Sequence, residues 1–329
     1  MKKIIDEIKN TFKEALSTTW TLLKIMIPIS IIIKLISELG FVEIIGNALS
    51  PVMELVGLSG ELGIVWGTTM ITNIYGGLIA FSALSINHSY SVANVTVLAT
   101  MMLIAHTLPI ELRISQKAGV RLWFMLALRI GSAFTLGWIL NKIFSAFNLH
   151  NDAALIIWNP GQIDPSITGI IINELKNYTL IFLIIIGLMF LLKLLKISGI
   201  IDKLNNLLEP GLEFLGMSKK SAPTAIIGMT LGLSYGGGLL INEAKSGKLT
   251  TKDIFMSFSL MGLSHSLIED SLLLLSIGAS ISGILVGRLI FTTIIIVILI
   301  RIIRRISKQR FEKYFITKPI RKRIKKTES

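Results

Sequence analysis

Two histidines lie inside apolar stretches of the chain, and acidic residues follow each of them within five positions. Glu111 follows His106, and Glu269 and Asp270 follow His265. A neutral imidazole in such a setting can bind a metal ion, carry a proton or hydrogen bond a substrate. A structural histidine–carboxylate pair in the polar core of a helix bundle explains the same pattern equally well, so both interpretations stay open.

Two arginines follow the histidines at a fixed spacing. Arg129 and Arg288 each lie 23 residues after a histidine and several residues into an apolar stretch. An arginine at the centre of a membrane span costs about 2.5–3.5 kcal/mol on insertion scales, so each should have a partner. The nearest acidic candidates are Glu111, Glu269 and Asp270. We predict structural ion pairs among these five residues, with a role in coupling as the alternative.

Two other apolar stretches, 62–84 and 222–244, are interrupted by the sequence Tyr-Gly-Gly and by small polar residues. Glycines permit a tight reversal and leave backbone amides and carbonyls open to a ligand, although close helix packing is the alternative use of such residues. We expect the tips of these stretches to lie near a binding site. With the histidines, the predicted substrate-binding residues are Thr72, Asn73, Tyr75, Gly76, Gly77, His106, Ser234, Tyr235, Gly236, Gly237, Asn242 and His265.

These features recur because the chain contains an internal repeat with an offset of 159 residues. His106 aligns with His265 and Arg129 with Arg288 at this offset, and the two Tyr-Gly-Gly sequences align at 160. Each copy has the same order of parts. These are an apolar span (18–37; 177–197), an amphipathic stretch (41–56; 199–215), the interrupted stretch (62–84; 222–244), a span with the histidine (92–112; 253–276) and a span with the arginine (119–146; 280–306).

The distribution of basic residues predicts the relative orientation of the two copies. If the interrupted stretches fold back as re-entrant hairpins, each copy has three spans and the copies are inverted. The cytoplasmic loops between the termini then hold eleven Lys and Arg residues, and the outside loops hold two. If the stretches cross fully, the counts are five and eight. Because basic residues concentrate in cytoplasmic loops, we predict the inverted arrangement.

The composition indicates a membrane protein. Of 329 residues, 52% are hydrophobic and 16% are charged, and mean hydropathy is +0.71. The apolar runs are long enough to cross about 30 Å of hydrocarbon. We therefore predict an all-α polytopic membrane protein with an inverted repeat of six transmembrane helices, two re-entrant helical hairpins and two interfacial amphipathic helices. The expected parts are an amphipathic cytoplasmic helix (1–17), the first copy (18–146), an extracytoplasmic linker (147–176), the second copy (177–306) and a basic cytoplasmic tail (307–329).

The net charge of +13 could suggest nucleic acid, but its placement favours a membrane surface. Twelve of the 33 Lys and Arg residues follow Ile300, directly after the last apolar span. This is the usual position of a cytoplasmic anchor on anionic lipid. The expected partners are therefore the lipid bilayer and a small molecule or ion, without nucleic acid; a homo-oligomer is left open. The chain has no cysteine and no Walker A sequence, and no cofactor is expected.

Three segments resemble the Gate, or nucleoside recognition, domain family. Residues 44–61 (IIGNALSPVMELVGLSGE) resemble the opening of that domain, and residues 105–111 (AHTLPIE) and 262–270 (GLSHSLIED) resemble its second signature. The resemblance covers most of the chain as two Gate units. The family includes the core of concentrative nucleoside transporters, the gate region of ferrous-iron permeases and spore maturation proteins. It implies the same architecture that the charge distribution predicts, and it leaves the cargo open.

These observations favour a multi-pass protein of the cell membrane with both termini in the cytoplasm. The leading hypothesis is a secondary-transporter-like permease for a small polar solute or ion, with a nucleoside-like solute as one candidate. Its site would lie between the two hairpin tips and the histidine-bearing spans. The first alternative is a divalent metal-ion permease that uses His106, Glu111, His265, Glu269 and Asp270. The second is a non-transporting membrane scaffold similar to spore maturation proteins. No nucleophile and base suggest an enzyme.

Overall fold

The protein is all-helical wherever its structure is described. The computed structural model describes residues 2–85, 88–157, 167–214, 217–247 and 249–317. These residues form helices joined by short connections, with two isolated β-bridges and no strand. The prediction of an all-α protein is confirmed.

Five helical segments among the described residues are long and apolar enough to cross a membrane. The sixth predicted span, 253–276, is divided between α12 (Thr251–Leu263) and α13 (Glu269–Leu275). The five segments are Thr19–Glu38 in α1 (Lys2–Glu38), Val92–Ala118 across α5 (Val92–Ile104) and α6 (Leu108–Ala118), Leu122–Ala146 (α7), Tyr178–Leu195 in α8 (Ile167–Ile197) and Ser282–Arg305 across η3 (Ser282–Gly287) and α14 (Arg288–Arg305).

Two predicted boundaries differ from the structure. The amphipathic segment 1–17 and the first span form one continuous helix, α1, rather than two elements. The helix α8 begins at Ile167, about ten residues before the predicted span, so the end of the linker 147–176 is helical. Both differences have one cause. A helix continues past the edge of an apolar run when no residue at that edge stops it, and neither junction holds glycine or proline.

The chain divides into two compact units, and the repeat explains their composition. Unit 1 comprises Met1–Leu108, Gly131–Asp202 and Ile268–Leu289, and unit 2 comprises Pro109–Ile130, Lys203–Leu267 and Ile290–Ser329. The segments 109–130 and 268–289 are equivalent at the 159-residue offset, at both of their ends. Each unit therefore combines much of one copy with the same short segment of the other copy, and unit 1 also contains the second copy's first span, 177–197.

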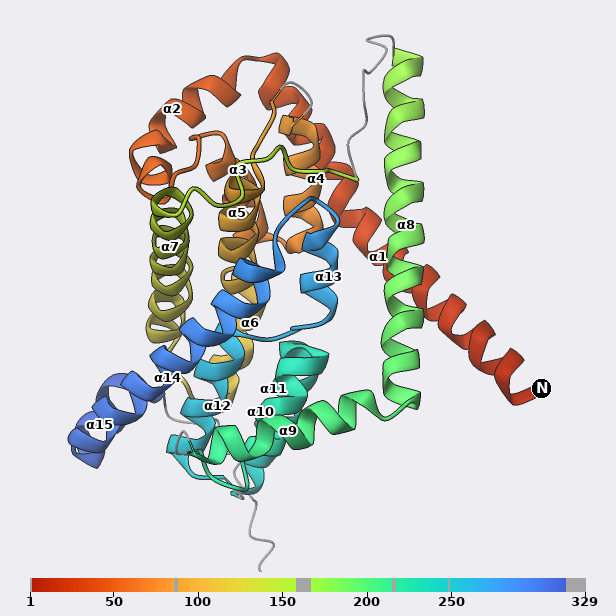
Figure 1. Cartoon of the computed structure of the whole chain (residues 1–329). Helices are drawn as coiled ribbons and strands as arrows, with labels where there is room; N and C mark the ends of the chain where they lie inside the picture. The colour runs from red at the N-terminus through yellow and green to blue at the C-terminus, as the bar shows by residue number, and fades with distance from the viewer. Residues whose placement is uncertain (1, 86–87, 158–166, 215–216, 248, 318–329) are drawn as a thin grey trace, which may run out of the picture. The chain divides into compact units, whose positions relative to one another are not determined.

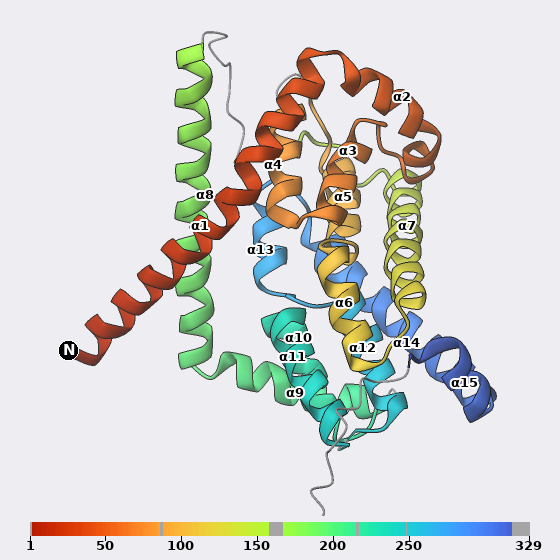
Figure 2. The same ribbon diagram turned by 180° about the vertical axis from the view of Figure 1, so that it is seen from behind.

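Unit 1 contains the first copy's short helices together with two long helices. The helix α2 (Phe41–Met53) continues into η1 (Glu54–Val56) and leads into α3 (Leu62–Ile71) and α4 (Ile74–Leu84). The helix α4 packs against α3 and α1, and α1 also crosses α8, where the rings of Phe12 and Phe182 meet edge to face (Figures 1 and 2). The helix α5 packs against α3, η3 and α13. The buried core of this unit lies among these short helices, whereas apolar side chains of α1 and α8 remain exposed.

Unit 2 contains the corresponding helices of the second copy. The amphipathic α9 (Ile200–Phe214) precedes α10 (Ala222–Leu231) and α11 (Leu233–Ser246), which pack against each other and against α12. The helix α6, the first two turns of α7, most of α14 and the terminal α15 (Lys308–Phe315) complete the unit.

Glycines allow the two short helices of each pair to approach closely. In the first pair, a methyl group on Gly77 would lie 1.8 Å from Oγ1 of Thr69. In the second pair, a methyl group on Gly236 would lie 2.4 Å from Cα of Gly228. Gly77 is the second glycine of the first Tyr-Gly-Gly sequence, and Gly236 is the first glycine of the second. Both Tyr-Gly-Gly sequences thus lie where two short helices pack closely.

Candidate functional site

The helix that precedes each histidine ends two residues before it. The helix α5 ends at Ile104, and Ala105 adopts φ −130° and ψ 56°. The helix α12 ends at Leu263, and Ser264 adopts nearly the same conformation, φ −145° and ψ 67°. The residues after the histidines, Thr107 and Ser266, have φ of 51° and 48°. The two copies therefore break their helices in the same way.

Pro109 is not the cause of this break. The sequence suggests that this proline interrupts the first histidine-bearing span, because proline removes a backbone donor. The equivalent residue of the second copy is Ile268, and that copy breaks at the same place. Pro109 lies in the first turn of α6, a position that tolerates proline. The proline is compatible with the break but not required for it.

The two imidazoles themselves stabilise the broken helix ends. Nδ1 of His106 lies 3.0 Å from the carbonyl oxygen of Met102, and Nδ1 of His265 lies 2.7 Å from that of Met261. In a continuous helix a backbone amide four residues later bonds such a carbonyl. The side chain replaces that amide, so a buried acceptor keeps its hydrogen bond.

The backbone next to each histidine bonds to the hairpin of its own unit. The amide of Thr107 donates to the carbonyl of Thr69 at 3.1 Å, and the amide of Leu267 donates to that of Met229 at 2.9 Å. Thr69 and Met229 lie near the ends of α3 and α10, where carbonyls lack helical partners. Each break is thus joined to the end of the first helix of a hairpin.

In unit 2, Glu111 connects His265 with Arg129. Nε2 of His265 lies 3.2 Å from Oε1 of Glu111, and Nη1 of Arg129 donates to Oε2 of the same carboxylate. The three residues are buried, with relative exposures of 1%, 7% and 1% for His265, Glu111 and Arg129. Glu111, one of the acidic candidates named from the sequence, is thus the residue that lies beside Arg129. We refer to these three residues as the triad.

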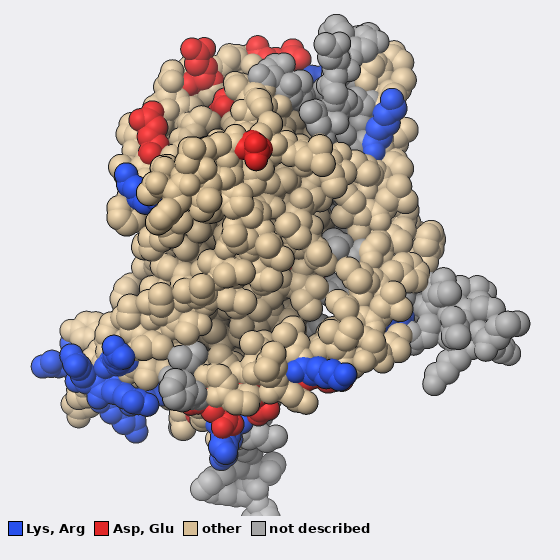
Figure 3. Space-filling model, viewed as in Figure 1, with Lys and Arg blue, Asp and Glu red and all other residues tan. Residues whose placement is uncertain are grey.

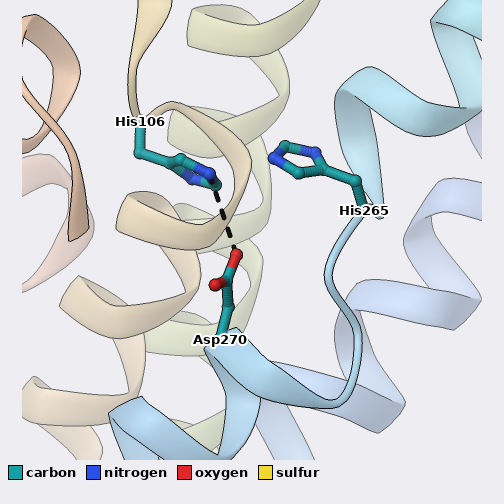
Figure 4. Close-up of side chains that lie close together, drawn as sticks. All are labelled: His106, His265 and Asp270. Carbon is teal, nitrogen blue, oxygen red and sulfur yellow. Dashed lines mark ion pairs between the residues drawn. The ribbon is translucent and has the colours of Figure 1, made fainter. Parts of the chain in front are cut away.

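In unit 1, His106 faces Asp270, which lies in the first turn of α13. Nε2 of His106 lies 3.8 Å from Oδ2 of Asp270 (Figure 4). This separation is longer than a hydrogen bond. Tyr75 of the first hairpin hydrogen bonds to the neighbouring Glu269. The fully buried Arg288 donates from Nη2 to the carbonyl of Leu103 at 3.2 Å.

The hydrogen bonds of the imidazoles define what each histidine–carboxylate pair can hold. A carbonyl oxygen only accepts, so Nδ1 of each histidine must carry a proton. Nε2 then faces a carboxylate with either a second proton or a lone pair. If Nε2 carries a proton, that proton can lie between Nε2 and the carboxylate. If Nε2 has a lone pair, a cation can occupy the same position. Each pair is therefore a place for one proton or one cation.

The predicted metal ligands belong to both units. His106, Glu269 and Asp270 belong to unit 1, whereas Glu111 and His265 belong to unit 2. Imidazole nitrogen with carboxylate oxygen suits several divalent metals. In unit 2, both oxygens of Glu111 have protein partners.

The other predicted binding residues occupy the hairpins. The hydroxyl of Thr72 donates to the carbonyl of Thr68 at 2.6 Å, and Oδ1 of Asn73 accepts from the amide of Gly76 at 2.9 Å. These side chains therefore hold the turn itself. Gly76 is buried in unit 1, as are Gly77, Gly236 and Gly237 in their units, whereas Asn242 is exposed. Ser234 and Tyr235 lie in the first turn of α11, and their side chains are outside the described part of the structure.

Sequence reasoning missed three partners in these clusters. These partners are the backbone carbonyls of Met102, Met261 and Leu103, and the residue type at a position does not indicate whether its carbonyl accepts a side-chain hydrogen bond. The pairs His106-Thr107 and His265-Ser266 were a usable signal, because a small polar residue after each buried histidine occupies the left-handed conformation.

The fold and these clusters define a polytopic helical membrane protein with two repeated units, and the comparisons name its family. The model of the Gate family, described as nucleoside recognition, matches residues 19–117 and 179–283, which together form more than half of the chain. The chain therefore belongs to the Gate family, and the resemblance noted in its sequence is confirmed.

A bacterial membrane protein is similar to this chain over most of its length. The chain is 29% identical over 280 residues to the uncharacterized membrane protein YvoD of Bacillus subtilis (strain 168), a match that spans 83% of this chain and 87% of the relative. No solved structure matches the chain.

Proposed function

We propose that the protein is a membrane permease for a small polar solute or ion, in which the helix break of each unit supplies binding groups. The observation that carries this proposal is the repeated break at His106 and His265, each with a buried imidazole and a carboxylate. Non-helical backbone and ionisable side chains at membrane depth are costly, and they mark substrate or ion pathways in membrane proteins.

The description of the family supports a nucleoside as the first solute to examine. Neutral polar groups at helix ends suit a solute with several hydrogen-bonding atoms, and the helix breaks supply them. The imidazole–carboxylate pairs add one position for a proton or a cation in each unit. A solute that enters with a proton or a cation would use both kinds of group.

Uptake into proteoliposomes tests this proposal directly. The protein is reconstituted, and radiolabelled nucleosides, divalent metals and small anions are offered in turn. We expect saturable uptake of one class, and we expect His106→Asn to reduce it at least tenfold. His88→Asn is the matched control, because His88 lies outside the helix breaks and is exposed. Absence of flux for every class would contradict the proposal and favour the scaffold alternative.

The proposed arrangement in the membrane is inverted, with both termini in the cytoplasm of a plasma membrane and with α3–α4 and α10–α11 as re-entrant hairpins. These helices have 10 to 14 residues. At 1.5 Å per residue the four helices are about 15–21 Å long, which is too short to cross alone. The loop charges support the same arrangement.

Cysteine labelling tests the topology, because the chain has no native cysteine. Ser89, Ser282, Lys117 and Ser246 are exposed and suit substitution by cysteine. An impermeant maleimide should label positions 89 and 282 from outside in intact cells and positions 117 and 246 only after lysis. Labelling of position 117 from outside would contradict the inverted arrangement.

A divalent cation is the second candidate cargo, and one distance favours it. The 3.8 Å between Nε2 of His106 and Oδ2 of Asp270 is wide for a hydrogen bond, and a small movement of either side chain would bring both atoms to bonding distance of one metal ion. Calorimetric titration with Mn²⁺ and Co²⁺ in detergent should then give saturable binding that His106→Asn abolishes and the exposed control His88→Asn retains. Binding that survives His106→Asn would leave the pair a structural role.

A further inference from the structure

We propose that the segment 307–317 of unit 2 is an anionic-lipid-binding strap that holds the loop between α6 and α7. It comprises the cap Ser307, the helix α15 and the two residues after it. The helix begins where the side chain of Ser307 accepts a hydrogen bond from the amide of Arg310. This inference does not depend on transport, because it concerns a surface away from the helix breaks of unit 2.

Backbone hydrogen bonds fasten the strap to the loop that joins α6 to α7. The amide of Arg121 donates to the carbonyl of Phe315 at 2.9 Å, and the amide of Thr317 donates to that of Gly119 at 2.9 Å. Nε of Arg121 also donates to the carbonyl of Ile316 at 3.0 Å. Gly119 has φ of 109°, a conformation that favours glycine. The strap is therefore paired with a specific loop.

An aromatic cluster anchors the inner face of α15. Phe311 is 1% exposed and meets Phe255 of α12 edge to face, with ring centroids 5.3 Å apart. Phe315 meets Phe124 of α7 in the same geometry at 5.3 Å. Edge-to-face aromatic pairs add stabilisation beyond that of the area they bury. The position of the strap on unit 2 is thus set by apolar packing, and its charged residues are left to face outward.

The outer face of α15 carries basic and aromatic side chains. Positions 310, 313 and 314 follow one another around the helix, opposite the buried face. Arg310 and Lys313 are exposed, and Tyr314 is 51% exposed with Nζ of Lys313 5.5 Å from its ring centroid. Trp123 is 51% exposed and donates from its indole nitrogen to the carbonyl of Tyr314. A tryptophan and a tyrosine beside basic residues are typical of a bilayer interface.

The positive charge on and around α15 favours an anionic membrane surface. The segment 301–317 carries six Lys and Arg residues and one acidic residue, Glu312. Lys and Arg side chains gather over α15 and the end of α14 (Figure 3). Each basic residue near an anionic surface contributes favourably, and a zwitterionic surface offers no such attraction. The partner that this face fits is therefore the head-group layer of anionic phospholipid.

The loop that the strap holds lies between two members of the triad. The helix α6 carries Glu111 and α7 carries Arg129, and residues 119–121 join these helices. Lipid bound at α15 would therefore order the loop on which the spacing of this ion pair depends. We infer that anionic lipid stabilises unit 2 through this connection.

A fluorophore on the strap tests the inference. Gln309→Cys adds the chain's one cysteine on an exposed position of α15 and is labelled with an environment-sensitive dye. The protein is placed in nanodiscs of phosphatidylcholine alone or mixed with phosphatidylglycerol. We expect a blue shift of the dye and an unfolding temperature several degrees higher in the mixed lipid. High salt should reduce the blue shift, because salt screens surface charge.

Charge variants complete the test. R310Q/K313Q should lose both lipid responses, whereas K220Q/K252Q should keep them, since Lys220 and Lys252 are exposed elsewhere in unit 2. Unfolding in phosphatidylcholine alone shows whether R310Q/K313Q is folded. The charge-conserving variant Lys313→Arg should keep both lipid responses. Equal responses of the two charge variants, or no lipid response in the parent, would overturn the inference.

Discussion

The two histidine–carboxylate clusters occupy equivalent positions of the repeat but differ in the distance between the histidine and the carboxylate. Glu111 and Asp270 are equivalent at the 159-residue offset, as are the two histidines and the two arginines. The longer side chain of Glu111 reaches within 3.2 Å of His265 and also bonds Arg129, whereas Asp270 stays 3.8 Å from His106. Glu111 has one methylene group more than Asp270, and this difference in length accompanies the difference between the two histidine–carboxylate distances. Duplication repeats the backbone, and side-chain length then distinguishes the two clusters.

Removing the charge of Glu111 should have the largest effect on stability. Glu111→Gln leaves the buried Arg129 without its carboxylate and weakens the bond to His265. Breaking a buried ion pair on one side costs about 3–5 kcal/mol. The unfolding of the protein in detergent measures this loss. Asp270→Asn is the matched variant at the equivalent position, where the carboxylate lies 3.8 Å from its histidine, and it should cost clearly less. An equal loss would show that the shorter distance in unit 2 does not add stability.

Exchanging the two acids sharpens the same comparison. Asp270→Glu should close the 3.8 Å separation and occupy the place proposed for a proton or cation. We expect at least a tenfold loss of uptake with the fold retained. Glu111→Asp should instead open the triad and lower stability by about 1–3 kcal/mol, the cost of a buried group that loses its bond. Uptake that is unaffected by Asp270→Glu would contradict a role for the separation.

The hairpins differ between the copies as well. A methyl group on Gly236 would meet the backbone of Gly228, whereas one on Gly77 would meet the side chain of Thr69. Overpacking costs about 1–3 kcal/mol. Gly236→Ala should therefore destabilise the protein within this range in thermal unfolding, and Thr69→Gly should rescue much of the loss in Gly77→Ala. Gly238→Ala is the control, since nothing lies within 4 Å of its added carbon; a loss as large there would exclude the packing explanation.

The smallest predicted effect concerns a contact that only the first copy can make. The hydroxyl of Tyr90 donates to Glu61 at 2.7 Å, and the residue equivalent to Glu61 is Lys220. Tyr90→Phe should cost about 0.5–1.5 kcal/mol in unfolding experiments. Burial, followed by the hydrogen bond to Glu61, raises the pKa of Tyr90. The protonated phenol is thus favoured in the fold, so this contribution is complete below about pH 10 and is lost only above it. A difference between parent and variant that changes between about pH 6 and about pH 9 would contradict this assignment.

Local sequence patterns predicted the elements better than their ends. Apolar runs and glycine interruptions located the long helices and the two pairs of short helices, because each signal acts within a few turns of one helix. The separate helix at 1–17 was wrong, since hydropathy changes at residue 18 while the backbone continues as α1. The first histidine-bearing span was expected to break at Pro109, whereas α5 ends at Ile104 and both copies share an imidazole bond to the carbonyl four residues earlier.

The sequence by itself determined that this is an all-helical membrane protein of two repeated halves, and it identified the buried ionisable residues. Composition and repeat spacing carry that information without reference to distant contacts. Only the tertiary structure decided which residues meet. The segments 109–130 and 268–289 are exchanged between the units, so His106 meets Asp270 and His265 meets Glu111, each an acid of the other copy. No spacing along the chain encodes this, because the exchange depends on how separate helices pack after the chain breaks at each histidine.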